Sequence, residues 1–240
     1  MSNIPINEYF EIHWAAVPRW AARSSSDLID IVESPGGEVT LIMVDVQGSG
    51  ATGHALAHAT AARLADVIRD GISLELAAKL VSQWLCSNRN GSVLASILLA
   101  RAAQVDQPVT IAIFGTHVIG QKHGESYEVE IRDAPMAGQM SDPAPTILHC
   151  DLPADGVLLL PNDGCAGTAA ALRALIDAAL NGSLPSDSAG ALLDAALTRD
   201  QGRPRTDMAV AAINRVKGDG PELRMAGSRT VPGRLGRIVP

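Results

Sequence analysis

Two apolar segments of this 240-residue sequence each lead to an aspartate followed by glycine. Asp45 ends the apolar run at 38–45 and precedes the Gly48 and Gly50 turn, and Asp163 follows the apolar run at 156–161 and precedes Gly164. A carboxylate at the end of a buried strand is held rigidly, and glycine lets the chain turn sharply beside it. Two such sites in one chain predict that both carboxylates face the same ligand.

Two further aspartates stand at the start of predicted strands, Asp27 before an apolar run and Asp207 before the last one. If these strands are neighbours in the sheets, four carboxylates come together without an associated His or Cys. Such an all-oxygen ligand set suits the hard cations Mg²⁺ and Mn²⁺. The sequence therefore predicts a divalent metal site.

Hydrophobic periodicity and turn residues predict the elements that position these aspartates. Strands at 27–33 and 38–45 form a hairpin through the Ser-Pro-Gly-Gly turn at 34–37, and helices follow at 54–69 and 74–86. The remaining expected elements are strands at 92–101, 108–114, 126–132, 146–150 and 156–161, helices at 168–180 and 189–198, and a strand at 208–216. This irregular order argues against a doubly wound parallel sheet and favours an α+β sandwich of two antiparallel sheets flanked by helix pairs.

Composition and charge argue against several classes of function. The net charge is −7, with 26 acidic against 19 basic residues, which argues against a nucleic-acid partner because phosphate contacts need clustered Lys and Arg. The N-terminal residues lack the apolar run of a signal peptide, and we find no stretch long enough for a membrane span. The three cysteines lack metal-binding spacing and are expected to be reduced, so we expect a cytoplasmic protein with no membrane partner.

The four acidic segments resemble, in order and spacing, the motifs of the metal-dependent serine/threonine protein phosphatases (PPM or type 2C), and most of all the bacterial SpoIIE-like branch. The Asp-x-x-Gly-x-Gly motif of that family matches 45–50, its first acidic motif is similar to 26–30, and its Thr/Ser-Asp-Gly motif is similar to 162–164. Its terminal acid pair is similar to 206–209, where Thr206 replaces the first acid. The resemblance implies a phosphatase domain at 24–216, with an N-terminal extension at 1–23 and a basic, Gly/Pro-rich, poorly packed tail at 217–240.

This resemblance implies a protein phosphatase that hydrolyses phosphoserine or phosphothreonine with a metal-activated water. It implies two Mn²⁺ or Mg²⁺ ions bridged by Asp45, with Asp163 and the Val46 carbonyl as further ligands; Asp45 and Asp163 are the expected catalytic residues. Asp27 would anchor metal-bound waters, and Asp207 is the fourth candidate ligand. Because adjacent side chains of a strand face opposite sides, Thr206 and Asp207 should not both be ligands, and one metal is expected to bind weakly.

The resemblance also implies a phosphoprotein substrate, such as an anti-sigma antagonist or a similar regulator. Arg23 is a candidate for binding the substrate phosphate, because a planar guanidinium matches two phosphate oxygens.

Other interpretations remain open at this stage. Gly48, Gly50 and Gly53 form a Gly-x-Gly-x-x-Gly sequence between a strand and a helix, which is the fingerprint of a dinucleotide-binding oxidoreductase. Thr206 raises the alternative of a weakly active or inactive phosphatase-fold module that binds a phosphorylated regulator. His54 and His58 share a helix face but lack an accompanying acid, so packing is favoured over metal binding. The segment 115–117 resembles an Ala-Gly-His segment of SpoIIE-like proteins and is expected to form a structural turn.

Overall fold

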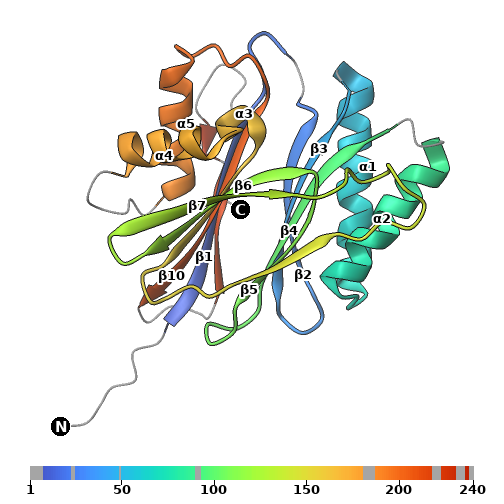
Figure 1. Ribbon diagram of the computed structural model, residues 1–240, viewed down its shortest axis with the longest axis horizontal. Coiled ribbons are helices and arrows are strands. Elements are labelled where there is room, and N and C mark those ends of the chain that lie inside the picture. Colours follow the sequence, from blue (N-terminus) through green and yellow to red (C-terminus); the bar gives the residue numbers. More distant parts are fainter. Residues whose placement is uncertain are drawn as a thin grey trace.

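The computed structural model describes residues 8–22, 25–48, 50–89, 93–180, 187–217, 223–230 and 236–237. Within them, two β-sheets pack face to face, and helices cover the outer face of each sheet (Figure 1). The chain thus has the α+β sandwich architecture that the sequence predicts.

The larger sheet has the order β12-β11-β1-β10-β9-β6-β7. Its strands are β1 (Glu8–Val17), β6 (Thr116–His123), β7 (Ser126–Asp133), β9 (Val157–Pro161), β10 (Met208–Lys217), β11 (Leu223–Thr230) and β12 (Gly236–Arg237). Neighbouring strands are antiparallel except for the parallel pair β1 and β11. The helices on its outer face are α3 (Asp163–Ala166), α4 (Ala169–Ala179) and α5 (Ser188–Arg199).

The smaller sheet is antiparallel throughout, with the order β2-β3-β4-β5-β8. Its strands are β2 (Asp27–Glu33), β3 (Val39–Val46), β4 (Ala95–Ala102), β5 (Val109–Phe114) and β8 (Thr146–Cys150). Two long helices, α1 (Gly50–Arg69) and α2 (Leu74–Arg89), cover its outer face.

The core lies in three layers because both faces of each sheet are covered. Along β4, Ile97 and Leu99 point into the layer beneath α1 and α2, whereas Leu98 points into the layer between the sheets. A third layer packs Leu159 of β9 against α4 and α5. Strands with two covered faces are apolar at nearly every position, which explains the continuous apolar runs in the sequence.

Two segments that the sequence analysis places outside the domain contribute strands to the larger sheet. Residues 8–17 form β1 between β10 and β11, and its Phe10 and Ile12 are buried in the core between the sheets. Residues 223–230 form β11, which pairs with β1. The N-terminal extension at 1–23 and the tail at 217–240 are therefore corrected at these two segments.

A third difference lies at β6. We expected the segment 115–117 to form a turn only, but Gly115 is followed directly by an eight-residue strand that lies between β7 and β9. This strand carries His117, a residue that lines the cavity described below.

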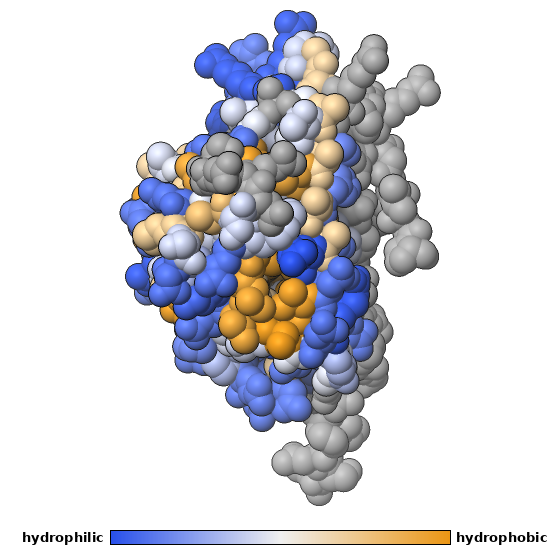
Figure 2. Space-filling model, turned by 90° about the vertical axis from the view of Figure 1, so that its right-hand side faces the viewer, coloured by the Kyte–Doolittle hydropathy of each residue, from blue (hydrophilic) through white to orange (hydrophobic). Residues whose placement is uncertain are grey.

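The helical face of the smaller sheet is partly apolar at its surface. Leu76 and Leu80 of α2 are 43% and 41% exposed, and Ala55, Leu56 and Trp84 line a hollow between α1 and α2. Figure 2, which views this side of the molecule, shows an apolar area around a hollow. None of the helices in the described part of the chain combines the length and apolar character needed to cross a membrane.

Candidate metal centre

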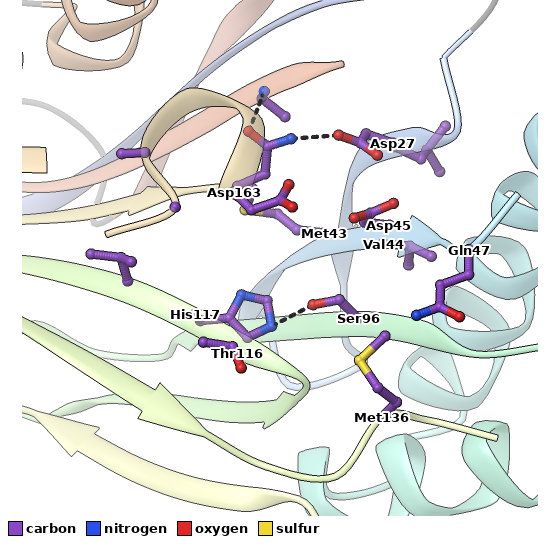
Figure 3. A pocket seen from close by; sticks show the side chains of 16 residues that line it. Asp27, Met43, Val44, Asp45, Gln47, Ser96, Thr116, His117, Met136 and Asp163 are labelled. Atoms are coloured by element: carbon purple, nitrogen blue, oxygen red, sulfur yellow. Dashed lines mark hydrogen bonds between the residues drawn. The ribbon is translucent and has the colours of Figure 1, made fainter. Parts of the chain in front are cut away.

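Asp27 and Asp45 lie directly opposite each other on the neighbouring antiparallel strands β2 and β3. Side chains of directly opposite residues project to the same face of a sheet, so the two carboxyl groups meet. They point into a cavity of about 400 Å³ between the ends of the two sheets (Figure 3). The hairpin that the sequence predicts is thus what brings these two aspartates together.

Asp163 reaches the same cavity from the larger sheet. It is the first residue of the short helix α3, directly after β9, and its side chain points toward Asp45 (Figure 3). Arg199 of α5 holds this helix in place by donating from Nη1 to the carbonyl of Cys165 at 2.8 Å and from Nη2 to that of Gly164 at 3.3 Å. The Asp163 carboxylate, which follows an apolar strand and precedes glycine, is therefore held in a fixed position.

Asn162, the residue before Asp163, connects the two sheets through its side chain. Its Oδ1 accepts hydrogen bonds from the backbone N–H groups of Cys165 and Ala209, both at 2.9 Å. Its Nδ2 donates to Oδ2 of Asp27 and, at 2.9 Å, to the carbonyl of Asp207. Asn162 thus uses both ends of its amide to hold α3, β10 and the Asp27 carboxylate in a fixed arrangement.

The carboxyl groups are electrostatically crowded. Burial raises the pKa of Asp27 to about 10, and the nearby charges of Asp45, Asp207 and Asp163 act in the same direction. Burial also raises the pKa of Asp45, although its hydrogen bond with Asp27 opposes part of that shift. Without a cation, Asp27 therefore keeps a proton that it shares with Asp45.

This donor set fits divalent cations of the Mg²⁺ and Mn²⁺ type, which bind through one or two carboxylates and retain several waters. A cation at Asp27 and Asp45 would replace the proton that the pair otherwise shares. Among the described residues, no three acidic, histidine or cysteine side chains already converge on one point. Water molecules would therefore complete the coordination of any ion held here, and the 400 Å³ cavity has room for them.

Asp207 lies beside the cavity without lining it. Its Oδ1 accepts a hydrogen bond from the backbone N–H of Arg19 at 2.7 Å, and its Oδ2 accepts from the N–H of Ser26 at 2.8 Å. Both oxygens are thus engaged with the chain that leads into β2. Asp207 contributes negative charge to the site, but its role as a metal ligand stays a prediction.

Thr206 lies against Gly164, the residue after Asp163. A Cβ atom added to Gly164 would lie 2.7 Å from Oγ1 of Thr206 and 2.0 Å from the carbonyl oxygen of Asp207. Only glycine fits between α3 and the start of β10 at this distance, since real Cβ atoms do not approach so closely. Gly164 thus lets the chain at residues 206 and 207 pack against the start of α3.

His117 and Ser96 form the opposite wall of the cavity (Figure 3). His117 comes from β6 of the larger sheet and Ser96 from β4 of the smaller one, and Nε2 of the imidazole lies 3.0 Å from Oγ of Ser96. Met43 and Met136 add apolar surface to the lining. His117 and Asn162 both stand in segments that resemble family motifs, but local sequence pattern alone does not mark either as a site residue.

The other sequence predictions have different outcomes. Val46 is buried and is not among the lining residues, so the role of its carbonyl stays a prediction. Arg23 lies outside the described residues. His54 donates a hydrogen bond from Nδ1 to the carbonyl of Ser25 at 2.9 Å, and its ring packs edge-on against that of His58.

The dinucleotide-binding alternative is not supported. The chain segment with Gly48, Gly50 and Gly53 does connect β3 to α1, but β3 pairs antiparallel with both of its neighbours. The dinucleotide fingerprint requires a parallel βαβ unit, with an acid at the end of the second strand. The glycines instead allow a close turn, in which a Cβ on Gly53 would lie 3.1 Å from the carbonyl carbon of Gly48.

Comparison with known proteins decides the family. The family model for stage II sporulation protein E (SpoIIE) matches residues 35–216, which is most of the chain. The chain belongs to the SpoIIE family. This confirms the resemblance to the SpoIIE-like branch of the PPM phosphatases. No curated protein sequence matches the chain significantly.

Solved structures show that this SpoIIE-family chain has the PP2C phosphatase fold. A structure of the PP2C phosphatase domain and a regulatory-domain fragment of SpoIIE from Bacillus subtilis is similar with a TM-score of 0.73 and 16% identity, covering 89% of this chain and 65% of that one. The S. agalactiae serine/threonine phosphatase is similar with a TM-score of 0.71 and 14% sequence identity, and the match covers 85% of this chain and 99% of that one. The catalytic domain of the serine/threonine protein phosphatase PstP in complex with two manganese ions is similar with a TM-score of 0.67 and 14% sequence identity. That match covers 88% of this chain and 100% of the PstP domain.

Proposed function

We propose that this protein is a metal-dependent protein phosphatase that hydrolyses phosphoserine or phosphothreonine. The observation that carries the proposal is that Asp27, Asp45 and Asp163 come from three separate elements and line one cavity. The chain belongs to the SpoIIE family and has the fold of serine/threonine phosphatases, which supports the same activity.

Each acidic residue has a distinct part in this proposal. Asp45 and Asp163 would hold the divalent ions, with the Val46 carbonyl as a further candidate ligand, and Asp27 would anchor metal-bound waters. When bound, Mn²⁺ or Mg²⁺ lowers the pKa of a water to near neutrality and neutralises charge on the phosphate. Because water would attack the phosphate directly, the reaction would need no intermediate in which the phosphate is attached to a side chain of the enzyme.

The surrounding residues keep the carboxylates in place. Asn162 donates a hydrogen bond to Asp27, and Asp207 holds the backbone of Ser26. Preorganised groups of this kind need no rearrangement when charge develops on the phosphate. We also propose that Arg23 binds the substrate phosphate and that Asp207 adds negative charge to the site, with direct coordination as its further candidate role.

We infer that the substrate is a phosphorylated regulatory protein, such as an anti-sigma antagonist, encountered in the cytoplasm. The support is membership of the SpoIIE family, one member of which is described as a cell fate determinant. Phosphoproteins incubated with the enzyme and Mn²⁺ should lose phosphoserine or phosphothreonine. Candidate antagonists can be compared by the rate of that loss.

The direct test is hydrolysis of a chromogenic phosphate ester and of a phosphoserine peptide in millimolar Mn²⁺. Activity should require the ion, disappear in EDTA, and be absent from the Asp45→Asn variant, which serves as the control for a contaminating phosphatase. Equal hydrolysis by wild type and Asp45→Asn protein would contradict the proposal.

A weakly active phosphatase-fold module that binds a phosphorylated regulator is a second candidate. Thr206 favours it, since this neutral hydroxyl lies where the resemblance leads one to expect a carboxylate. The module would bind Mn²⁺ and phosphopeptide in calorimetry but release no phosphate, whereas the enzyme would turn over.

A further inference from the structure

His117 is brought into the cavity by a tight turn between the two sheets. Gly115 connects β5 to β6 with φ +87°, and a Cβ at this position would lie 2.7 Å from Oγ of Ser96. His117 is only 8% exposed, and its imidazole faces the cavity from the wall opposite Asp27 and Asp45 (Figure 3). It is therefore a buried polar side chain directed into the candidate metal centre.

Hydrogen bonds fix which nitrogen of His117 carries the proton. Nε2 lies 3.0 Å from the carbonyl oxygen of Phe114, and a carbonyl can only accept. Nε2 is therefore the donor, and in the neutral ring Nδ1 keeps a free lone pair. The contacts with Ser96 and Phe114 both involve Nε2, and in Figure 3 the nitrogen not bonded to Ser96 lies on the side of the ring toward Asp163.

The ring is held in its neutral form. Burial lowers the pKa of His117, although hydrogen bonding with Phe114 and Ile97 and the charge of Asp163 partly oppose the shift. A neutral imidazole whose other nitrogen donates to a backbone carbonyl has the arrangement typical of metal-binding histidines. A divalent cation placed between this lone pair and the Asp163 carboxylate could be held by both.

We propose that Nδ1 of His117 is a metal ligand, which together with Asp163 and water holds the second divalent ion of the site. This inference rests on the proposed divalent-ion site and specifies its ligands. Nitrogen ligands favour Mn²⁺ and Co²⁺ over Mg²⁺, which prefers oxygen. His117 would thus supply a ligand to a site in which Thr206 replaces an acid, and make that site selective for Mn²⁺.

The test is metal binding by the purified full-length chain, with no substrate present. His117→Gln is the informative variant because the glutamine amide can still donate to the Phe114 carbonyl from near the Nε2 position but has no nitrogen at the Nδ1 position. His13→Gln is the matched control, since His13 is also 8% exposed within a strand and does not line the cavity. Isothermal titration calorimetry with Mn²⁺ and with Mg²⁺ gives the affinities, and pulsed EPR of bound Mn²⁺ detects ¹⁴N.

We expect His117→Gln to weaken Mn²⁺ binding at one of two sites by about 10- to 100-fold, the range typical of perturbed metal sites, with a smaller effect on Mg²⁺. The ¹⁴N modulation of the wild type should be lost in His117→Gln and kept in His13→Gln. Asp163→Asn should remove the same Mn²⁺ ion, and the double variant should be no worse than the more damaging single variant.

Three results would overturn the inference: an equal loss of Mn²⁺ and Mg²⁺ affinity, unchanged affinities, or wild-type protein without ¹⁴N modulation. If wild-type protein binds Mn²⁺ through Asp45 but shows no ¹⁴N signal, the ligand role of His117 fails and the proposed phosphatase site stands. If it binds no divalent ion, both fail together.

Discussion

The carboxylate of Asp207 holds the residue that precedes Asp27 in the chain: its Oδ2 accepts hydrogen bonds from the backbone N–H of Ser26 at 2.8 Å and from the Ser26 hydroxyl at 3.2 Å. Its Oδ1 accepts from the N–H of Arg19. Asp207 thus connects the start of β10 to the start of β2. The fourth acidic residue of the sequence pattern has a structural task, which is to position the strand end that carries Asp27.

Replacing Asp207 should therefore affect stability as well as activity. Asp207→Ala leaves the N–H groups of Arg19 and Ser26 without their acceptor, which costs about 1–3 kcal/mol. For a chain of this size, we expect the melting temperature to fall by about 2–4 °C per kcal/mol. Asp207→Asn keeps one acceptor oxygen and should lie between alanine and wild type. Asp66→Ala, at an exposed helix position, is the control and should melt like wild type; an Asp207→Ala protein as stable as this control would contradict the structural role.

Divalent ions should stabilise the fold more strongly as the pH rises. A raised folded-state pKa means that folded Asp27 binds a proton that the unfolded chain releases above about pH 4, so metal-free stability falls from there toward about pH 10. Mn²⁺ removes this penalty by replacing the proton and by mass action. We expect the difference in melting temperature between Mn²⁺ and EDTA to grow from pH 5.5 to pH 8. Differential scanning fluorimetry measures this difference. If it is absent or independent of pH, Asp27 and Asp45 do not share a proton in the metal-free protein.

The neutral variants Asp45→Asn and Asp163→Asn should each lower phosphatase activity by more than tenfold while the protein remains folded. Each substitution removes ligand charge but almost no volume, so it acts on the metal rather than on packing. Asp30→Asn is a matched control, because Asp30 is on the same strand as Asp27 but does not line the cavity. If either variant retains more than about a tenth of the wild-type kcat, the activation free energy has changed by less than about 1.4 kcal/mol. That result would show that the metals lie elsewhere.

Replacing Asn162 should lower the stability of the protein, although Asn162 is not itself a predicted metal ligand. Asn162→Ala removes two acceptor and two donor interactions that connect α3, β10 and Asp27. We expect a loss of stability of at least about 1–3 kcal/mol in urea unfolding. Asn162→Ser retains a short acceptor for the N–H of Cys165 and should recover part of it. Equal stability of wild type and Asn162→Ala would show that these hydrogen bonds contribute little.

The sequence predicts those parts of the site that depend on local pattern. Asp45 and Asp163 each follow an apolar strand and precede glycine, so both could be identified from a few neighbouring residues. His117 depends on contacts with Ser96 and Phe114, and both of these residues lie in the other sheet. No periodicity in the sequence records such a contact between distant segments.

The same limit explains the missed strand β1. Glu8, Glu11 and His13 interrupt its apolar pattern, and its partners in β10 lie about 200 residues further along the chain. The hairpin of β2 and β3 could be predicted because its turn and both strands are contiguous. Local signals therefore predict the smaller sheet better than the larger one, which is assembled from both ends of the chain.

Thr206→Asp tests whether the site lacks a ligand where this chain departs from the family motif. The hydroxyl of Thr206 lies 2.7 Å from the position of a Cβ on Gly164, the residue after Asp163, so a carboxylate at residue 206 would add negative charge at the start of α3. A carboxylate binds Mn²⁺ or Mg²⁺ better than a neutral hydroxyl does. The Mn²⁺ concentration for half-maximal activity should therefore fall in Thr206→Asp, whereas Thr206→Asn, of nearly the same size but uncharged, should leave it near the wild-type value.

The extra carboxylate has an opposite effect when no ion is present. Thr206→Asp adds a negative charge near the acidic cavity, so the variant in EDTA should melt at a lower temperature than wild type. Its gain in melting temperature on addition of Mn²⁺ should exceed that of wild type, because the ion relieves a larger repulsion and binds more tightly. If neither the half-maximal Mn²⁺ concentration nor this gain changes, residue 206 does not face the metal, and Asp207 must then supply the remaining charge of the site from its position against Ser26.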